Sequence, residues 1–142
     1  MFGKILYIGD NIARVALIEG AVVSDIMNLH VIFEDEKKQI LGEVDDISEK
    51  EIKISFLGEI VNGIFIGGVI RKPSLTSKIR PIKPEEMKLI IGDEGNDTML
   101  LGYSPLYDAC PIRVKYNDLF SNHMAIFGNS GSGKSCSVSR II

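Results

Sequence analysis

The sequence predicts a mainly β protein, in which a small N-terminal β-barrel is followed by the opening strands and the glycine-rich loop of an incomplete α/β domain. Three features of the chain predict this fold class. Short β-type runs separated by glycine or acidic residues fill the first 70 residues. Proline, serine, threonine and basic residues then dominate residues 73–84. Brief apolar runs follow, and the last of them leads into a glycine-rich loop at residues 128–135.

The barrel is predicted from the spacing and the alternation of its strands. Ile52, Ile54 and Phe56 alternate with polar residues, which is the period-two pattern of a strand with one solvated face. Runs of about six residues that recur about every ten positions are typical of a small barrel or sandwich. Glycines in or beside these runs permit the bulges that let a small sheet curl, so we expect a closed barrel rather than an open sheet. The expected strands are residues 3–8, 12–18, 22–33 with a break, 39–47, 51–57 and 63–70.

The charge distribution separates the expected barrel from the segment that follows it. Residues 1–70 hold six basic and twelve acidic side chains, a net charge of -6, whereas residues 71–88 hold six basic and two acidic ones. The basic segment is interpreted either as a solvated connector that leaves the barrel or as a contact to a phosphate backbone. Its basic residues are Arg71, Lys72, Lys78, Arg80, Lys83 and Lys88.

A domain boundary is expected between residues 92 and 93. A short helix is predicted to start at Pro84, because proline suits the first helical turn and the acids Glu85 and Glu86 suit the positive end of the helix dipole. A turn-rich stretch at residues 92–96 follows. The division is therefore a barrel assembly domain with its connector at 1–92 and the incomplete start of a second domain at 93–142. In the second domain, residues 99–102, 112–116 and 124–127 are expected to be strands, and residues 136–142 the start of a helix.

The composition excludes several classes of protein. Of the 142 residues, 45% are hydrophobic and 25% are charged, as in ordinary globular proteins. No apolar run approaches the roughly 20 residues that span a membrane, and no leader segment is recognised, so a cytoplasmic location without membrane contact is expected. Cys110 and Cys136 have no second cysteine or histidine at metal-binding spacing and are interpreted as reduced thiols.

Residues 128–135 carry the most specific motif of the chain. They fit the pattern G-x-x-x-x-G-K-[ST], a P-loop, between a predicted strand and a predicted helix. Glycines at these positions let successive N–H groups point at phosphates, which lie at the positive end of the helix. ATP binding is therefore predicted in preference to a chance glycine and serine turn. The predicted nucleotide-binding residues are Gly128, Asn129, Ser130, Gly131, Ser132, Gly133, Lys134, Ser135 and Cys136.

Two residues of this loop have the most specific predicted roles. Lys134 is the predicted catalytic residue, because its ammonium should reach the β- and γ-phosphates. The Ser135 hydroxyl is the predicted ligand of the nucleotide's Mg²⁺. Hydrolysis also needs an acidic residue on a neighbouring strand and often an arginine from another subunit, and both are expected beyond Ile142. The 142-residue chain alone is therefore expected to be inactive.

The segment around the loop resembles the HerA branch of the HerA/FtsK superfamily. Members of that branch typically read H-x-A-I-x-G-x-T-G-S-G-K-S, and this chain has His123, Ala125 and Ile126 at the matching positions before Gly128. Ser130 stands where the family has threonine, which keeps a hydroxyl at this position. The barrel, the proline-containing connector and residues 114–119 are also similar to the HerA arrangement, so the resemblance covers the whole chain.

The resemblance implies a barrel of the HerA/ATP synthase type joined to a RecA-like ATPase core, with ATP and Mg²⁺ as cofactors. It implies a homo-oligomer, a hexameric ring that threads double-stranded DNA through the ATPase core and acts as an ATP-hydrolysing DNA translocase or helicase. It also implies an effector protein on the barrel face. That effector would be a NurA-like nuclease or, in antiviral defence, a protein such as a sirtuin-like NAD hydrolase.

Two other functions stay open. The chain is also interpreted as a non-catalytic assembly module, in which the apolar residues of 57–70 either contact a neighbouring protein or fill the barrel core. A rotary or secretion-type ATPase subunit also places a barrel before a P-loop, but the Ser-Gly-Ser centre of this loop fits that class poorly. His30 and His123 are interpreted as structural. Tyr103, Tyr107 and Tyr116 fit core and turn positions as well as they fit stacking on a base.

Overall fold

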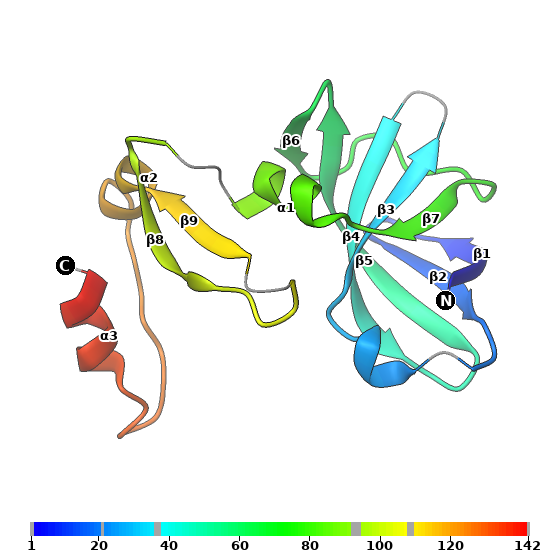
Figure 1. The fold of residues 1–142 in the computed structure, drawn as a ribbon. Helices are drawn as coiled ribbons and strands as arrows, with labels where there is room; N and C mark the ends of the chain where they lie inside the picture. The colour runs from blue at the N-terminus through cyan, green and yellow to red at the C-terminus, as the bar shows by residue number, and fades with distance from the viewer. Residues whose placement is uncertain (1, 21, 36–37, 92–94, 108–109, 142) are drawn as a thin grey trace. The chain divides into compact units, whose positions relative to one another are not determined.

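The computed structural model describes residues 2–20, 22–35, 38–91, 95–107 and 110–141. The chain forms two compact units, Met1–Leu89 and Ile90–Ile142. Both units are drawn in Figure 1, and each is described by itself below. The expected domain boundary between residues 92 and 93 lies outside the described residues. No described helix is long and apolar enough to cross a membrane.

The first unit is built on one antiparallel sheet of seven strands. The order along the sheet is β1-β2-β5-β4-β3-β7, and β6 pairs with β5 beside this path. The prediction of a mainly β fold is thus confirmed. The strands are β1 (Phe2–Ile8), β2 (Ile12–Leu17), β3 (His30–Asp35), β4 (Lys38–Ile47), β5 (Glu51–Val61), β6 (Ile64–Gly67) and β7 (Lys78–Pro81).

The sheet curls into a half-barrel (Figure 1). The ladder between β4 and β5 shifts register between Leu41 and Gly42 and again between Val44 and Asp46, and such irregularities bend and twist a strand. Gly42 leaves room at the first shift, because a Cβ there would lie 2.6 Å from Cγ2 of Ile54. Among the described residues, no ladder joins the outer strands β1 and β7. A closed barrel was expected, and the structure shows a curled sheet whose hydrogen bonds do not form a continuous ring among the described residues.

Alternate residues of the strands form the apolar core of the first unit. In β5, Ile52, Ile54 and Phe56 are buried while Lys53 is exposed, which confirms the predicted period-two pattern. Phe33 packs edge to face on Phe56, with ring centroids 5.4 Å apart. Burial of such side chains is the main favourable contribution to folding. The core cluster comprises Ile5, Ala13, Val15, Ile26, Val31, Phe33, Ile40, Val44, Ile52, Ile54 and Phe56.

Two segments of the first unit differ from the sequence prediction. Residues 22–33, expected to be a strand with a break, contain the 3₁₀ helix η1 (Val23–Asp25) and a turn before β3 begins. Asn28, in this turn, has φ 62°, in the left-handed region, which is incompatible with an extended strand. Residues 78–81, expected to belong to a solvated connector, form β7 and pair with β3. The connector interpretation is wrong for these residues, because their backbone hydrogen bonds extend the sheet.

Helix α1 (Pro84–Ile91) begins at the predicted proline and follows β7 closely. The amide of Lys83, just before the helix, donates a hydrogen bond of 2.9 Å to the Glu86 carboxylate. A carboxylate three positions into a helix that binds the amide at its start is half of a capping box. Met87 is buried, so the first turn of α1 is held by an apolar as well as by a polar contact.

Beyond α1, the described residues of the second unit form a β-hairpin and two short helices. The elements are β8 (Thr98–Tyr103), β9 (Pro111–Lys115), α2 (Tyr116–Phe120) and α3 (Lys134–Ile141). β8 and β9 pair antiparallel, and their positions confirm the predicted strands except that Tyr116 begins a helix. The Tyr116 amide donates to the Asp97 carbonyl oxygen at 2.8 Å, which ties the start of α2 to the turn before β8.

Candidate nucleotide-binding site

The glycine-rich loop leads directly into helix α3, as the sequence predicts. Within the loop, the amide of Ser132 donates to the Asn129 carbonyl oxygen at 3.1 Å and closes a tight turn. The amide of Ser137 then donates to the Gly133 carbonyl oxygen at 2.9 Å and begins the helical hydrogen bonds. The amides of the residues before Ser137 in α3 precede this first helical bond, so they are free to bind a ligand.

Two glycines of the loop adopt a conformation that other residues avoid. Gly131 and Gly133 both have φ 81°, in the left-handed region. Gly128 leaves room of a different kind, since a Cβ there would lie 2.5 Å from Oγ of Ser132, and that serine side chain would have to move. Alternating right- and left-handed residues make the concave nest of N–H groups that binds anions. Glycine at these three positions therefore serves the shape of the loop.

The side chain of Lys134 folds back over the start of the loop. Its Nζ donates hydrogen bonds to the carbonyl oxygens of Gly128, at 2.7 Å, and of Asn129, at 2.6 Å. The ammonium is therefore held at the loop, and the loop's backbone amides and the start of helix α3 add further positive potential. These three sources of positive potential together favour an anion at this position.

Ser135 and Cys136 lie in the first turn of α3, and both are exposed. The Ser135 carbonyl oxygen accepts a hydrogen bond of 2.8 Å from the Ser139 hydroxyl, and the Ser135 hydroxyl takes no part in this bond. Ser130 and Ser132 are exposed as well. Across the part of the chain that the structure describes, no group of three or more His, Cys, Asp or Glu side chains is placed to hold a metal ion.

The apolar residues before the loop are not in a strand. Residues 123–129 have no regular secondary structure, and Met124, Ile126 and Phe127 are exposed, Phe127 to 90%. The prediction of a strand at 124–127 is thus wrong for this structure. A strand needs hydrogen-bonding partners on at least one side, and no described strand pairs with this segment.

The other residues that the sequence analysis considered are two histidines, two cysteines and three tyrosines. His30 begins β3, where it is paired with Glu43 of β4, and burial lowers its pKa. His123 is exposed next to the loop. Cys110 is half-buried and Cys136 exposed, and both are free thiols. Of the three tyrosines, Tyr107 is buried, whereas Tyr103 and Tyr116 are exposed.

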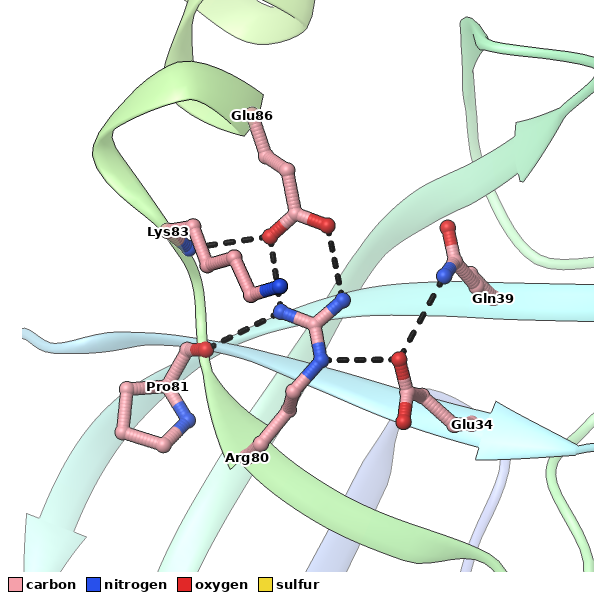
Figure 2. A network of polar contacts seen from close by, with 6 residues as sticks. All are labelled: Glu34, Gln39, Arg80, Pro81, Lys83 and Glu86. Atoms are coloured by element: carbon pink, nitrogen blue, oxygen red, sulfur yellow. Dashed lines mark hydrogen bonds and ion pairs between the residues drawn. The ribbon is translucent and has the colours of Figure 1, made fainter.

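The structure shows a polar network in the first unit that the sequence analysis did not predict. Arg80, on β7, binds Glu34 of β3 and Glu86 of α1 (Figure 2). The segment 71–88 was expected to present its basic side chains to solvent or to phosphate, but this arginine is partly buried and binds two carboxylates of the protein. The position of Glu86 in the first turn of the predicted helix was the local signal for part of the network.

A glycine-rich loop that turns through left-handed glycines into the start of a helix is the geometry of the P-loop class of proteins. Residues 100–142, which run from β8 through the loop to the end of the chain, match the family model described as helicase HerA, central domain. The match covers less than half of the chain, and for this segment it supports the HerA-type ATPase superfamily that the sequence predicted. No curated protein matches the chain.

Proposed function

We propose that this chain is the N-terminal part of a HerA-like, ATP-dependent DNA translocase or helicase. The observation that carries the proposal is the P-loop at residues 128–135, which leads into α3 within the segment that matches the HerA central domain. The proposed function is therefore to bind ATP at this loop and to use it to move along double-stranded DNA.

The residues of the loop fit the phosphates of a nucleotide. The left-handed glycines and the amides at the start of α3 supply hydrogen-bond donors, and Lys134 supplies a fixed positive charge. We assign Lys134 to the β- and γ-phosphates and the Ser135 hydroxyl to the Mg²⁺ that accompanies the nucleotide. Bound Mg²⁺ would neutralise charge that develops on the phosphate oxygens during hydrolysis. The backbone of residues 128–133 would hold the phosphates in place.

Nucleotide binding can be tested directly on the 142-residue chain. A fluorescent ATP analogue would be titrated against the wild type, Lys134→Ala and Lys115→Ala, with Mg²⁺ present. Lys115, at the end of β9, is an exposed lysine outside the loop and matches the charge change. We expect Lys134→Ala to weaken binding about tenfold or more, because a charge-assisted contact to phosphate is lost. Equal affinity in all three proteins would contradict the assignment of the loop.

The ring, the DNA and the effector belong to the same proposal. We propose a hexamer that encircles duplex DNA and carries an effector, such as a NurA-like nuclease or a sirtuin-like NAD hydrolase, on its barrel face. The net charge of -6 over residues 1–70 supports a protein rather than a DNA partner for the barrel, since phosphates repel like charge. A protein extended beyond residue 142 should displace a bound roadblock from duplex DNA in an ATP-dependent reaction, and failure to do so with intact ATP turnover would exclude translocation.

A second candidate function is a non-catalytic assembly module, and the hairpin of β5 and β6 favours it. Val61 pairs with Ile64 and Glu59 with Ile66, so these four side chains share one face of the hairpin. Glu59 accepts hydrogen bonds from the amides of Ile70, at 2.8 Å, and Arg71, at 3.0 Å, and this places the backbone of Ile70 next to Glu59.

We call Val61, Ile64, Ile66 and Ile70 the hairpin patch. Ile64, Ile66 and Ile70 are exposed to 66%, 51% and 92%. Ile60, between Glu59 and Val61, is buried, so the residues of 57–70 divide between the core and the surface instead of all filling the core. Contiguous exposed apolar side chains of this kind mark protein contacts.

A further inference from the structure

Arg80 joins three elements of the first unit. Its Nε donates a hydrogen bond of 2.7 Å to Glu34 on β3, and its two terminal nitrogens each donate one of 2.7 Å to the two carboxylate oxygens of Glu86 on α1 (Figure 2). The side chains of Arg80 and Glu86 are only 24% and 21% exposed. A bidentate arginine and carboxylate pair with this degree of burial is stronger and more directional than an exposed ion pair.

Glu86 contacts both Arg80 and the backbone at the start of α1. Besides binding Arg80, it accepts the hydrogen bond from the Lys83 amide that caps α1. The guanidinium beside Glu86 holds the pKa of that carboxyl below its ordinary value, so the pair stays ionised at neutral pH. The same carboxylate therefore starts the helix and ties it to β7.

Apolar and backbone contacts add to the polar anchoring of α1. Ile82 and Met87 are buried to 5% and 3% exposure, and the Ile82 amide donates to the His30 carbonyl oxygen at 3.0 Å. Lys88 and Leu89 are exposed, and the division between the two compact units falls between Leu89 and Ile90, inside the helix.

We propose that Arg80, Glu34 and Glu86 form a latch that makes the first turn of α1 a fixed part of the β sheet. Its release, by loss of the contact between Arg80 and Glu86, would free the first turn of α1 while the sheet stays folded. This proposal does not depend on the proposed function, because it concerns only residues of the first unit.

Hydrogen exchange of the 142-residue chain, followed by mass spectrometry, tests the latch. Arg80→Gln removes the charge and the guanidinium fork, and we expect peptides that cover residues 84–91 to exchange about tenfold faster or more, while the core strands β4 and β5 keep their protection. Arg14→Gln is the matched control. Arg14 is 56% exposed and lies 3.9 Å from Glu51, so its loss should leave α1 unchanged.

Two further variants keep the test decisive. Arg80→Lys retains the charge but not the fork, and we expect it to restore only part of the protection of α1. Glu86→Gln leaves the contact between Arg80 and Glu34 in place, and it replaces Arg80→Gln if that variant does not fold. Unchanged exchange in α1 would overturn the latch. Faster exchange spread evenly over the whole sheet would also overturn it, because the network would then stabilise the unit without any separate control of the helix.

Discussion

The ammonium of Lys134, at the first residue of α3, donates a hydrogen bond of 2.7 Å to the carbonyl oxygen of Gly128, at the first residue of the loop. The two ends of the P-loop motif are thereby brought together by the lysine itself. A second bond of 2.6 Å, to the Asn129 carbonyl oxygen, fixes the direction of the side chain. The charge is thus held at the loop by the protein's own backbone.

We expect Lys134→Ala to abolish ATP turnover in the protein extended beyond residue 142. The reason is the loss of the main fixed charge facing the β- and γ-phosphates. Turnover would be measured by phosphate release with and without duplex DNA, with Lys115→Ala as the control. Turnover at the normal rate with alanine at position 134 would mean that the P-loop assignment is wrong.

Gly133→Ala should weaken nucleotide binding without removing any charge. Gly133 has φ 81°, and a left-handed conformation costs a residue with a Cβ about 1–2 kcal/mol, so the affinity should fall about 5- to 30-fold. Gly102→Ala on β8 is the matched control, because a Cβ there meets nothing within 4 Å and its φ lies outside the left-handed region. Equal binding by the two variants would show that the loop does not need its left-handed turn to bind the nucleotide.

Residues 1–92 should fold without nucleotide and without the rest of the chain. The buried cluster of the first unit lies entirely within Met1–Leu89, so the piece carries its own core. Circular dichroism should give a β spectrum and a cooperative thermal transition. A mostly helical or unstructured spectrum would refute the division of the chain into these domains.

The hairpin patch should support association between protein molecules and not binding to DNA. We expect the 142-residue chain to self-associate in sedimentation experiments, and the double variant Ile64→Lys, Ile66→Lys to lose this association, because charges replace apolar side chains that are 66% and 51% exposed. Leu6→Lys, at an exposed position on β1, is the control. Tight, salt-sensitive binding to duplex DNA with no protein association would overturn this assignment.

The latch makes the stability of the first unit depend on pH in a defined direction. The hydrogen bonds from Arg80 hold the pKa of Glu86 below its ordinary value of 4.5, so ionised Glu86 stabilises the fold above that pH, and its contribution is lost as the pH falls through the lowered pKa. The difference in melting temperature between the wild type and Glu86→Gln should be largest at about pH 7 and shrink below about pH 4.5. Glu85→Gln, one residue earlier and exposed, is the control. A difference that grows on acidification would contradict the role of ionised Glu86.

Local sequence patterns determined the features that depend on a few neighbouring residues. The alternation of Ile52, Ile54 and Phe56 predicted which face of β5 is buried, since successive side chains of a strand point to opposite sides. Pro84 marked the start of α1 for a similarly local reason. The glycine and lysine spacing of residues 128–135 specified the loop and the helix after it, because backbone freedom and helix polarity act within a single turn.

Tertiary structure decided the features that depend on distant partners. Arg80 lies 46 residues from Glu34 in the sequence, and nothing in a basic segment indicates that one of its arginines binds two acids inside the fold. Residues 78–81 became a strand because the edge of β3 was available to pair with them, whereas the more apolar residues 124–127 did not, because no described strand pairs with them. Within residues 57–70, only the pairing of β5 with β6 separated buried Ile60 from exposed Ile64. Composition records how apolar a segment is, but the pairing register determines which of its side chains face the core.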